Sequence, residues 1–299
     1  MKKQIRGSLC LLAGTLIWGF AFIAQSVGMD YIGPFTFQAV RCALAAGFLF
    51  PVSLLAERKR CSLRQSLRRW ADPKLWKAGT VCGLALFAAS SLQQIGLVET
   101  EPGKAGFLTA MYIVIVPLMG LFLGRKPPKA AIVSVLPAGL GLYLLSCTGV
   151  SRVSTGDLLL IGCAFAFSVQ ILLIERYAGE LDGIRLNCVQ ALVVSVVSLP
   201  FAALTETVRL SSIIACWLPL GFAGVLSMGV AYTLQIVGQR DLESSRASLI
   251  MSLESVFAAL GGWLILRERM LPREWLGCAL VFSAVLLSQL PERKKVEKK

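Results

Sequence analysis

Residues 248–266 read SLIMSLESVFAALGGWLIL, and Glu254 is the only charged residue in this apolar run. About 20 apolar residues are enough for an α-helix to cross the hydrocarbon core of a bilayer. An unpaired carboxylate costs several kcal/mol in that environment. The run therefore predicts a membrane-spanning helix in which Glu254 has a partner or faces a polar cavity.

The rest of the chain has the same apolar character. Of its 299 residues, 56% are hydrophobic and only 16% are charged. Long runs that are nearly free of charge recur from one end of the sequence to the other. This composition is atypical of a soluble domain and predicts an all-α, polytopic membrane protein.

Basic residues and cysteines exclude two other classes of protein. The net charge of +13 resembles that of a nucleic-acid binder, but the Lys and Arg residues lie in short loops and at the termini. That distribution is typical of a protein oriented in a bilayer, so no nucleic-acid partner is expected. The nine cysteines are scattered singly and the chain has no histidine, so we expect neither a metal site nor a cofactor.

Ten membrane-spanning helices are predicted from the apolar runs and from the Pro and Gly residues between them. The N-terminal segment is basic and then apolar like a signal peptide, but no clean small-residue cleavage site follows it, so we expect a retained first helix. The predicted helices lie near residues 7–28, 34–56, 75–97, 103–123, 129–148, 155–175, 184–204, 213–237, 245–266 and 273–290.

The orientation follows from counting Lys and Arg on alternate sides of these spans. If the N-terminus is cytoplasmic, the cytoplasmic loops and tails hold 23 of these residues and the opposite side holds six, while Arg41 lies within a span. This bias predicts a multi-pass protein of the bacterial inner (plasma) membrane with both termini in the cytoplasm.

An internal repeat is the clearest organisational signal. A shift of 142 residues aligns 92–146 with 234–288 without a gap and gives twelve identities. At a slightly larger shift, Pro51 aligns with Pro200 and Arg41 with Gln190. Because each copy would hold five helices, an odd number, the two copies enter the membrane from opposite sides. We expect inverted repeats at 7–148 and 155–290, followed by a basic tail at 291–299.

Two charges are predicted to lie deep within spans, Arg41 and Glu254. Their expected depths differ by only about 6 Å at the helical rise per residue, so an ion pair between them is geometrically feasible. For Glu254 three roles stay open: an ion pair or hydrogen bond that fixes helix packing, a site that binds a proton, and a ligand for the transported molecule. Arg41 also has a structural alternative, because an arginine nearer the interface extends toward water.

Other intramembrane polar and aromatic residues form a second set of candidates. Tyr112 is the repeat partner of Glu254, so the two residues are expected at mirrored depths where the repeats meet. Glutamines within membranes more often join helices by hydrogen bonds than bind ligands. The set consists of Gln93, Gln94, Gln170, Gln190, Gln235, Trp18, Tyr112 and Tyr232.

Three segments together resemble one known family. They are TLIWGFAFIAQ at 15–25, ETEPGKAGFLTAMYIVIVPLMGLFLGRKP at 99–127 and SLIMSLESVFAALGGWLILRERM at 248–270. With the ten-span repeat, they resemble the EamA family of the drug/metabolite transporter superfamily over essentially the whole chain. Phe165-Ala166 stands where Trp-Ala is common in that family, so a tryptophan contact at this point is not expected.

The resemblance implies two EamA repeats and a central cavity lined mainly by helices 1, 3, 4, 6, 8 and 9. It also implies transport of amino acids, related metabolites or drugs, usually export across the bacterial inner membrane, by alternating access. Carried over residue by residue, the substrate-binding candidates are Trp18, Gln93, Tyr112, Gln170, Tyr232, Gln235 and Glu254.

A secondary transporter for a small molecule is therefore the leading hypothesis. The chain has no GxxxxGK[ST] loop, so it is not expected to use ATP directly. A passive facilitator or channel is the main alternative. An intramembrane enzyme is disfavoured, because such enzymes need a nucleophile with a base, paired acids or metal ligands. The expected partners are a small-molecule substrate and the lipid bilayer, with the chain acting as a monomer or weak homodimer.

Overall fold

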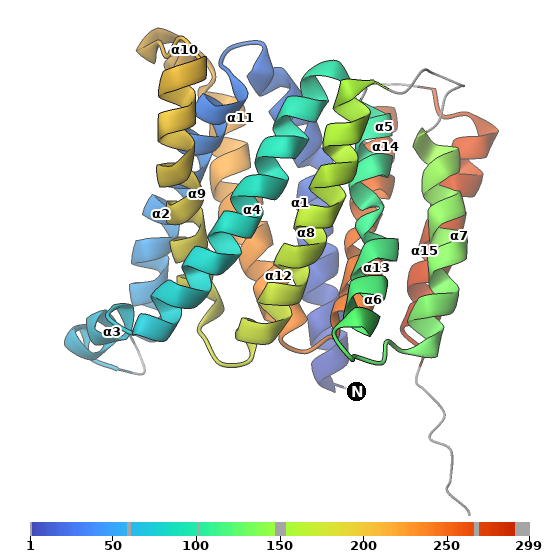
Figure 1. Cartoon of the computed structure of the whole chain (residues 1–299), viewed down its shortest axis with the longest axis horizontal. Helices are drawn as coiled ribbons and strands as arrows, with labels where there is room; N and C mark the ends of the chain where they lie inside the picture. The colour runs from blue at the N-terminus through green and yellow to red at the C-terminus, as the bar shows by residue number, and fades with distance from the viewer. Residues whose placement is uncertain (1, 59–60, 101, 147–153, 266–268, 291–299) are drawn as a thin grey trace, which may run out of the picture.

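In the computed structural model, the chain forms a bundle of helices that lie roughly side by side (Figure 1). The structure describes residues 2–58, 61–100, 102–146, 154–265 and 269–290, and this part of the chain contains helices and no strands. The predicted tail at 291–299 and the predicted helix ends at 147–148 and 266 lie outside the described residues.

The helices begin and end as follows: α1 Lys2–Met29, α2 Pro34–Glu57, α3 Leu63–Trp70, α4 Pro73–Glu99, α5 Pro102–Ala110, α6 Tyr112–Phe122, α7 Lys129–Ser146, α8 Thr155–Ala178, α9 Gly183–Thr205, α10 Leu210–Ala215, α11 Trp217–Gly221, the π-helix η1 Phe222–Ala231, α12 Tyr232–Gln239, α13 Ser244–Met251, α14 Leu253–Ile265 and α15 Pro272–Ser288.

Seven segments of the described chain are helical, long and apolar enough to cross a membrane. A shorter apolar helix covers Lys129–Leu145. The seven segments are Lys2–Met29, Pro34–Glu57, Pro73–Glu99, Lys104–Phe122, Thr155–Ala178, Gly183–Thr205 and Trp217–Gln239. These helices confirm the prediction of an all-helical, multi-pass membrane protein.

Three predicted spans are not continuous α-helices. The first two are interrupted at Met111, between α5 and α6, and at Ser252, between α13 and α14. At both points the backbone makes short-range bonds, from Val114 N to Met111 O at 3.0 Å and from Ser255 N to Ser252 O at 3.2 Å. The third contains the ten-residue π-helix η1. Neither kind of irregularity has a Pro at the interruption, so the sequence carries no obvious sign of either.

Helix α3 lies in the basic segment that was expected to be a loop. Its N-cap is Ser62, whose hydroxyl accepts from Gln65 N at 3.4 Å, while Gln65 Oε1 accepts from Ser62 N at 3.1 Å. This reciprocal pair is a capping box, which stabilises the first turn of a helix. The Ser-x-x-Gln pattern was a usable signal in the sequence.

Helices from the two halves of the chain pack along one another, α2 on α9 and α7 on α15. Helices α7 and α15 approach closely at Gly141 and Gly277. A Cβ at Gly141 would lie 2.7 Å from Gly277 O, and a Cβ at Gly277 would lie 2.6 Å from Gly141 O. The backbones of α7 and α15 therefore meet only because both positions lack a side chain.

At the α3 end of the bundle, a partly buried cluster of ion pairs surrounds Glu57. Arg185, at the start of α9, donates from Nη1 to Glu57 Oε1 at 2.9 Å and from Nη2 to Glu57 Oε2 at 2.5 Å. Arg69 of α3 donates to the same carboxylate at 2.6 Å. Because the Arg185 side chain is only 3% exposed, this carboxylate is the counter-charge on which its burial depends.

Replacing Glu57 with Gln should therefore lower the thermal stability of the purified protein. The loss is expected to be roughly 3 kcal/mol, because the change leaves a buried guanidinium without its counter-charge. The matched control is Glu180→Gln. Glu180 pairs with Lys74 at 4.0 Å and both side chains are mostly exposed, so the control should melt like the wild type. Equal melting temperatures for all three proteins would contradict this role of Glu57.

Candidate functional site

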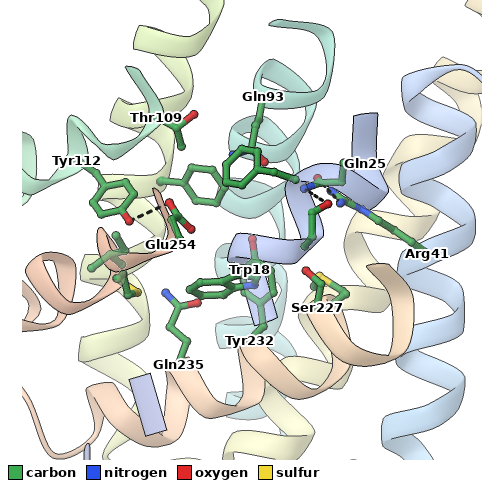
Figure 2. Close-up of a pocket in the computed structure, with 16 residues that line it drawn as sticks. Trp18, Gln25, Arg41, Gln93, Thr109, Tyr112, Ser227, Tyr232, Gln235 and Glu254 are labelled. Atoms are coloured by element: carbon green, nitrogen blue, oxygen red, sulfur yellow. Dashed lines mark hydrogen bonds between the residues drawn. The ribbon is translucent and has the colours of Figure 1, made fainter. Parts of the chain in front are cut away.

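A pocket with about 590 Å³ of space between atoms, part of it open to the outside, lies inside the bundle (Figure 2). Its wall combines apolar and aromatic side chains with a few polar groups: Trp18, Ala21, Phe22, Gln25, Arg41, Gln93, Thr109, Tyr112, Phe167, Ile171, Ser227, Met228, Tyr232, Gln235, Met251 and Glu254.

Tyr112 and Glu254 are in direct contact in this wall. The Tyr112 hydroxyl donates to Glu254 Oε1 at 3.1 Å, and the two residues are 4% and 7% exposed. Each lies just after a helix interruption, at the first residue of α6 and the second residue of α14. The two residues that the repeat pairs in sequence are thus also partners in space.

Arg41 is not paired with Glu254. Its Nη1 donates to Gln25 Oε1 at 2.6 Å, and its guanidinium lies 5.5 Å from the centre of the Phe37 ring. In the part of the chain that the structure describes, no carboxylate is within ion-pair distance of Arg41. The ion pair that the depths allowed is therefore absent from these residues, because the two side chains approach the pocket from different sides.

An aromatic pair separates the two charges. The rings of Trp18 and Tyr232 lie edge to face with centroids 4.9 Å apart. Figure 2 shows this pair between Glu254, beside Tyr112, and Arg41, beside Gln25. The pocket therefore carries a negative group at one side and a positive group at the other, with an apolar platform between them.

The glutamines occupy different places. Gln93 and Gln235 line the pocket. Gln170 lies behind the wall, fully buried, and accepts from Gln235 Nε2 at 3.2 Å. Gln94 and Gln190 are buried and are not among the residues that line the pocket. Of the seven substrate-binding candidates, six line the pocket and Gln170 supports one of them.

Several pocket residues were not singled out from the sequence. Gln25 lies seven residues, about two helical turns, after Trp18, so the helical period placed both on one face of α1. Thr109 precedes Tyr112 by three residues and had the same kind of signal. Ser227 lies in η1, and because the π-helix changes the period, no helical spacing pointed to it.

No group of three or more potential metal ligands exists among the described residues. The polar groups of the pocket instead suit hydrogen bonding and charge pairing with an organic molecule.

A family model describes this arrangement over nearly the whole chain. The model of the EamA-like transporter family matches residues 5–147 and 154–290. The chain belongs to the EamA-like transporter family. It is a transmembrane protein of the drug/metabolite transporter type, as the sequence motifs indicated.

Curated relatives of this EamA protein carry transporter names. An uncharacterized transporter of Archaeoglobus fulgidus is 31% identical over 96% of this chain and 87% of its own length. The threonine/homoserine exporter RhtA of Escherichia coli K12 is 28% identical over 96% of this chain and 92% of its own length. The uncharacterized transporter YoaV of Bacillus subtilis is 22% identical over 98% of this chain and all of its own.

The fold of this EamA protein also matches a solved structure. A crystal structure with 18% sequence identity superposes with a TM-score of 0.76 over 95% of this chain and 96% of the other. The likeness concerns the fold alone.

Replacing Tyr112 with Phe should destabilise the protein by about 1–3 kcal/mol, because the buried Glu254 carboxylate loses its hydrogen-bond donor. The matched control is Tyr143→Phe, since Tyr143 is 52% exposed. Thermal unfolding in detergent at neutral pH measures both variants. If the two variants melted at the same temperature, the Tyr112–Glu254 bond would not contribute to stability.

Proposed function

We propose that the protein is a secondary transporter that exports a small polar metabolite across a bacterial inner membrane by alternating access. The observation that carries this proposal is the pocket with Glu254 and Arg41 on opposite sides, inside a bundle of apolar helices. Charges in such a place cost several kcal/mol unless they serve a ligand, a pathway or a partner. The family and its named relatives are transporters, which argues against an enzyme.

Ten spans in two inverted repeats, at 7–148 and 155–290, provide the two states that alternating access needs. Besides the seven long segments, α7, the interrupted pair α13–α14 and α15 supply the other three crossings. The direct contact of Tyr112 with Glu254 supports the repeat, because residues related by a two-fold axis touch only where they lie at the axis.

Contacts between α2 and α9 give further support for this symmetry. Pro51 and Pro200 define an offset of 149 residues. Ser195 donates to Ala39 O at 2.8 Å and Cys188 donates to Ala46 O at 3.4 Å. Adding the offset to Ala39 gives Cys188, and adding it to Ala46 gives Ser195. Each contact is therefore the image of the other under exchange of the repeats.

Contacts at the ends of α2 and α9 are related by the same offset of 149 residues. Glu57, at the end of α2, binds Arg185 in the first turn of α9. Glu206, just after α9, accepts from the backbone of Thr36 in the first turn of α2 at 2.8 Å. At the offset of 149 residues, Glu57 aligns with Glu206 and Thr36 aligns with Arg185, so each of these two contacts is the repeat image of the other. One carboxylate thus holds the helix pair at each end.

Both termini are proposed to be cytoplasmic, because the basic segments at the α3 end of the bundle outnumber those at the other end. A C-terminal fusion to green fluorescent protein should fluoresce in cells, and a C-terminal fusion to alkaline phosphatase should be inactive. As a control, the same reporters inserted in the loop between α9 and α10 should give the reverse pattern. An active phosphatase at the C-terminus would overturn the orientation.

Transport is proposed to be coupled to protons through Glu254, which binds either a proton or the cargo. Transport by Glu254→Gln should therefore lose its dependence on pH, because the amide does not titrate, while exchange of cargo at constant pH continues. Glu180→Gln, a carboxylate change outside the pocket, should keep the pH profile of the wild type. Full pH dependence in the Glu254 variant would rule out this coupling site.

Counterflow in proteoliposomes tests the carrier mechanism itself, with labelled amino acids as probes because a relative is named a threonine/homoserine exporter. Unlabelled amino acid inside the vesicles should accelerate uptake of the labelled one. Uptake without this acceleration would identify a passive facilitator or channel. Because the pocket lies within one chain, a monomer or a weak homodimer suffices for this activity.

A further inference from the structure

We infer that Arg41, positioned by Gln25, is the subsite that binds the carboxylate of the transported molecule. From the sequence, Arg41 was expected to serve a structural or coupling role. The inference rests on the proposed transport function and adds to it the chemical group that the cargo must carry.

The first argument is a comparison of two buried arginines. Arg41 is 6% exposed and Arg185 is 3% exposed. Arg185 has a bidentate carboxylate partner in Glu57. The partners of Arg41 among the described residues are neutral, and they include the amide of Gln25, the ring of Phe37 and the thiol of Cys42. A buried guanidinium without a counter-ion is costly, so its retention in the wall of a pocket indicates that a ligand supplies the counter-charge.

The second argument is the orientation of the guanidinium. Gln25 Oε1 accepts from Arg41 Nη1 at 2.6 Å, and Gln25 Nε2 donates to Ala21 O at 3.3 Å on the same helix. This second bond fixes the amide, and the amide fixes the arginine. Arg41 Nε is buried and has no hydrogen-bond partner among the described residues. The planar fork of an oriented guanidinium matches the two oxygens of a carboxylate.

The charge of the pocket decides between possible anions. Arg41 is the only cation among the residues that line it, as far as the structure describes them. A single guanidinium balances a carboxylate, whereas a phosphate carries up to two charges and needs further cationic donors. Ser227, which Figure 2 shows on the same side of the pocket as Arg41 and Gln25, offers a hydroxyl to the same group.

The opposite side of the pocket holds the complementary charge. Glu254 accepts from Tyr112 and has no cationic side chain within ion-pair distance among the described residues. A cargo with an ammonium group would balance this charge while its carboxylate balances Arg41. The subsite therefore fixes the direction in which a zwitterion lies across the Trp18–Tyr232 pair.

The test is a binding experiment with matched ligands on the purified full-length protein. The twenty amino acids are first compared by thermal stabilisation, since only a ligand of the folded state raises the melting temperature. The best amino acid is then compared with its amide and its methyl ester, which keep the ammonium group and lack the carboxylate. We expect both derivatives to bind roughly 10- to 100-fold more weakly, the usual effect of losing a hydrogen bond between charged groups.

Variants assign the effect to Arg41. Arg41→Gln should bind the amino acid and its amide equally weakly, and Arg41→Lys should recover only part of the preference, because a lysine keeps the charge without the fork of donors. Arg64→Gln, a change of an exposed arginine on α3, should behave like the wild type. The comparison of an amino acid with its amide uses only the wild-type protein. It therefore still tests the inference if Arg41→Gln does not fold.

Two results would overturn the inference in different ways. Equal binding of an amino acid and its amide by the wild type would remove the carboxylate subsite and leave the transport function intact. If no amino acid and no simple carboxylate such as acetate or lactate stabilised the protein, the subsite would again be wrong. In that case, counterflow with neutral and cationic metabolites would show separately whether the transport proposal stands.

Discussion

Hydrocarbon offers no hydrogen-bond partner, and this constraint determines where each polar side chain of the bundle can lie. Polar side chains of this protein find hydrogen-bond partners in two kinds of place. At the ends of α2 and α9, carboxylates bind charged or backbone donors directly, as Glu57 does with Arg185 and Glu206 with Thr36. Inside the bundle, Glu254 accepts from Tyr112 and Arg41 donates to Gln25, neither has a counter-ion among the described residues, and both line a pocket. The paired charges stabilise the scaffold, and the charges left without a counter-ion mark the site.

The irregular helices are concentrated around this site. Interruptions at Met111 and Ser252 lie beside the Tyr112–Glu254 contact, and η1 contributes Ser227 and Met228 to the pocket wall. Interrupted backbone at membrane depth is tolerated where it lines a cavity or is covered by protein. In transporters, such discontinuous helices commonly form the binding site. The breaks therefore connect the local backbone to the proposed function.

The sequence predicted much of this arrangement, because the signals it used have a direct physical meaning. Apolar runs marked the long helices, and the 142-residue repeat related Tyr112 to Glu254, which are hydrogen-bonded in the structure. The position of a residue along a predicted helix indicates its depth in the membrane. It does not show in which direction around the helix axis the side chain points. That is why an Arg41–Glu254 ion pair looked feasible and Gln25 was overlooked. Helix α3 was missed although its capping box was present, whereas η1 left no signal in the sequence.

The most direct test of the account is an experimental structure of the protein with its transported molecule bound. The account predicts density for the molecule in the pocket between Glu254 and Arg41, with a carboxylate on the guanidinium and the body of the molecule against Trp18 and Tyr232. A molecule bound elsewhere in the bundle, or bound in this pocket with no contact to either charge, would contradict it.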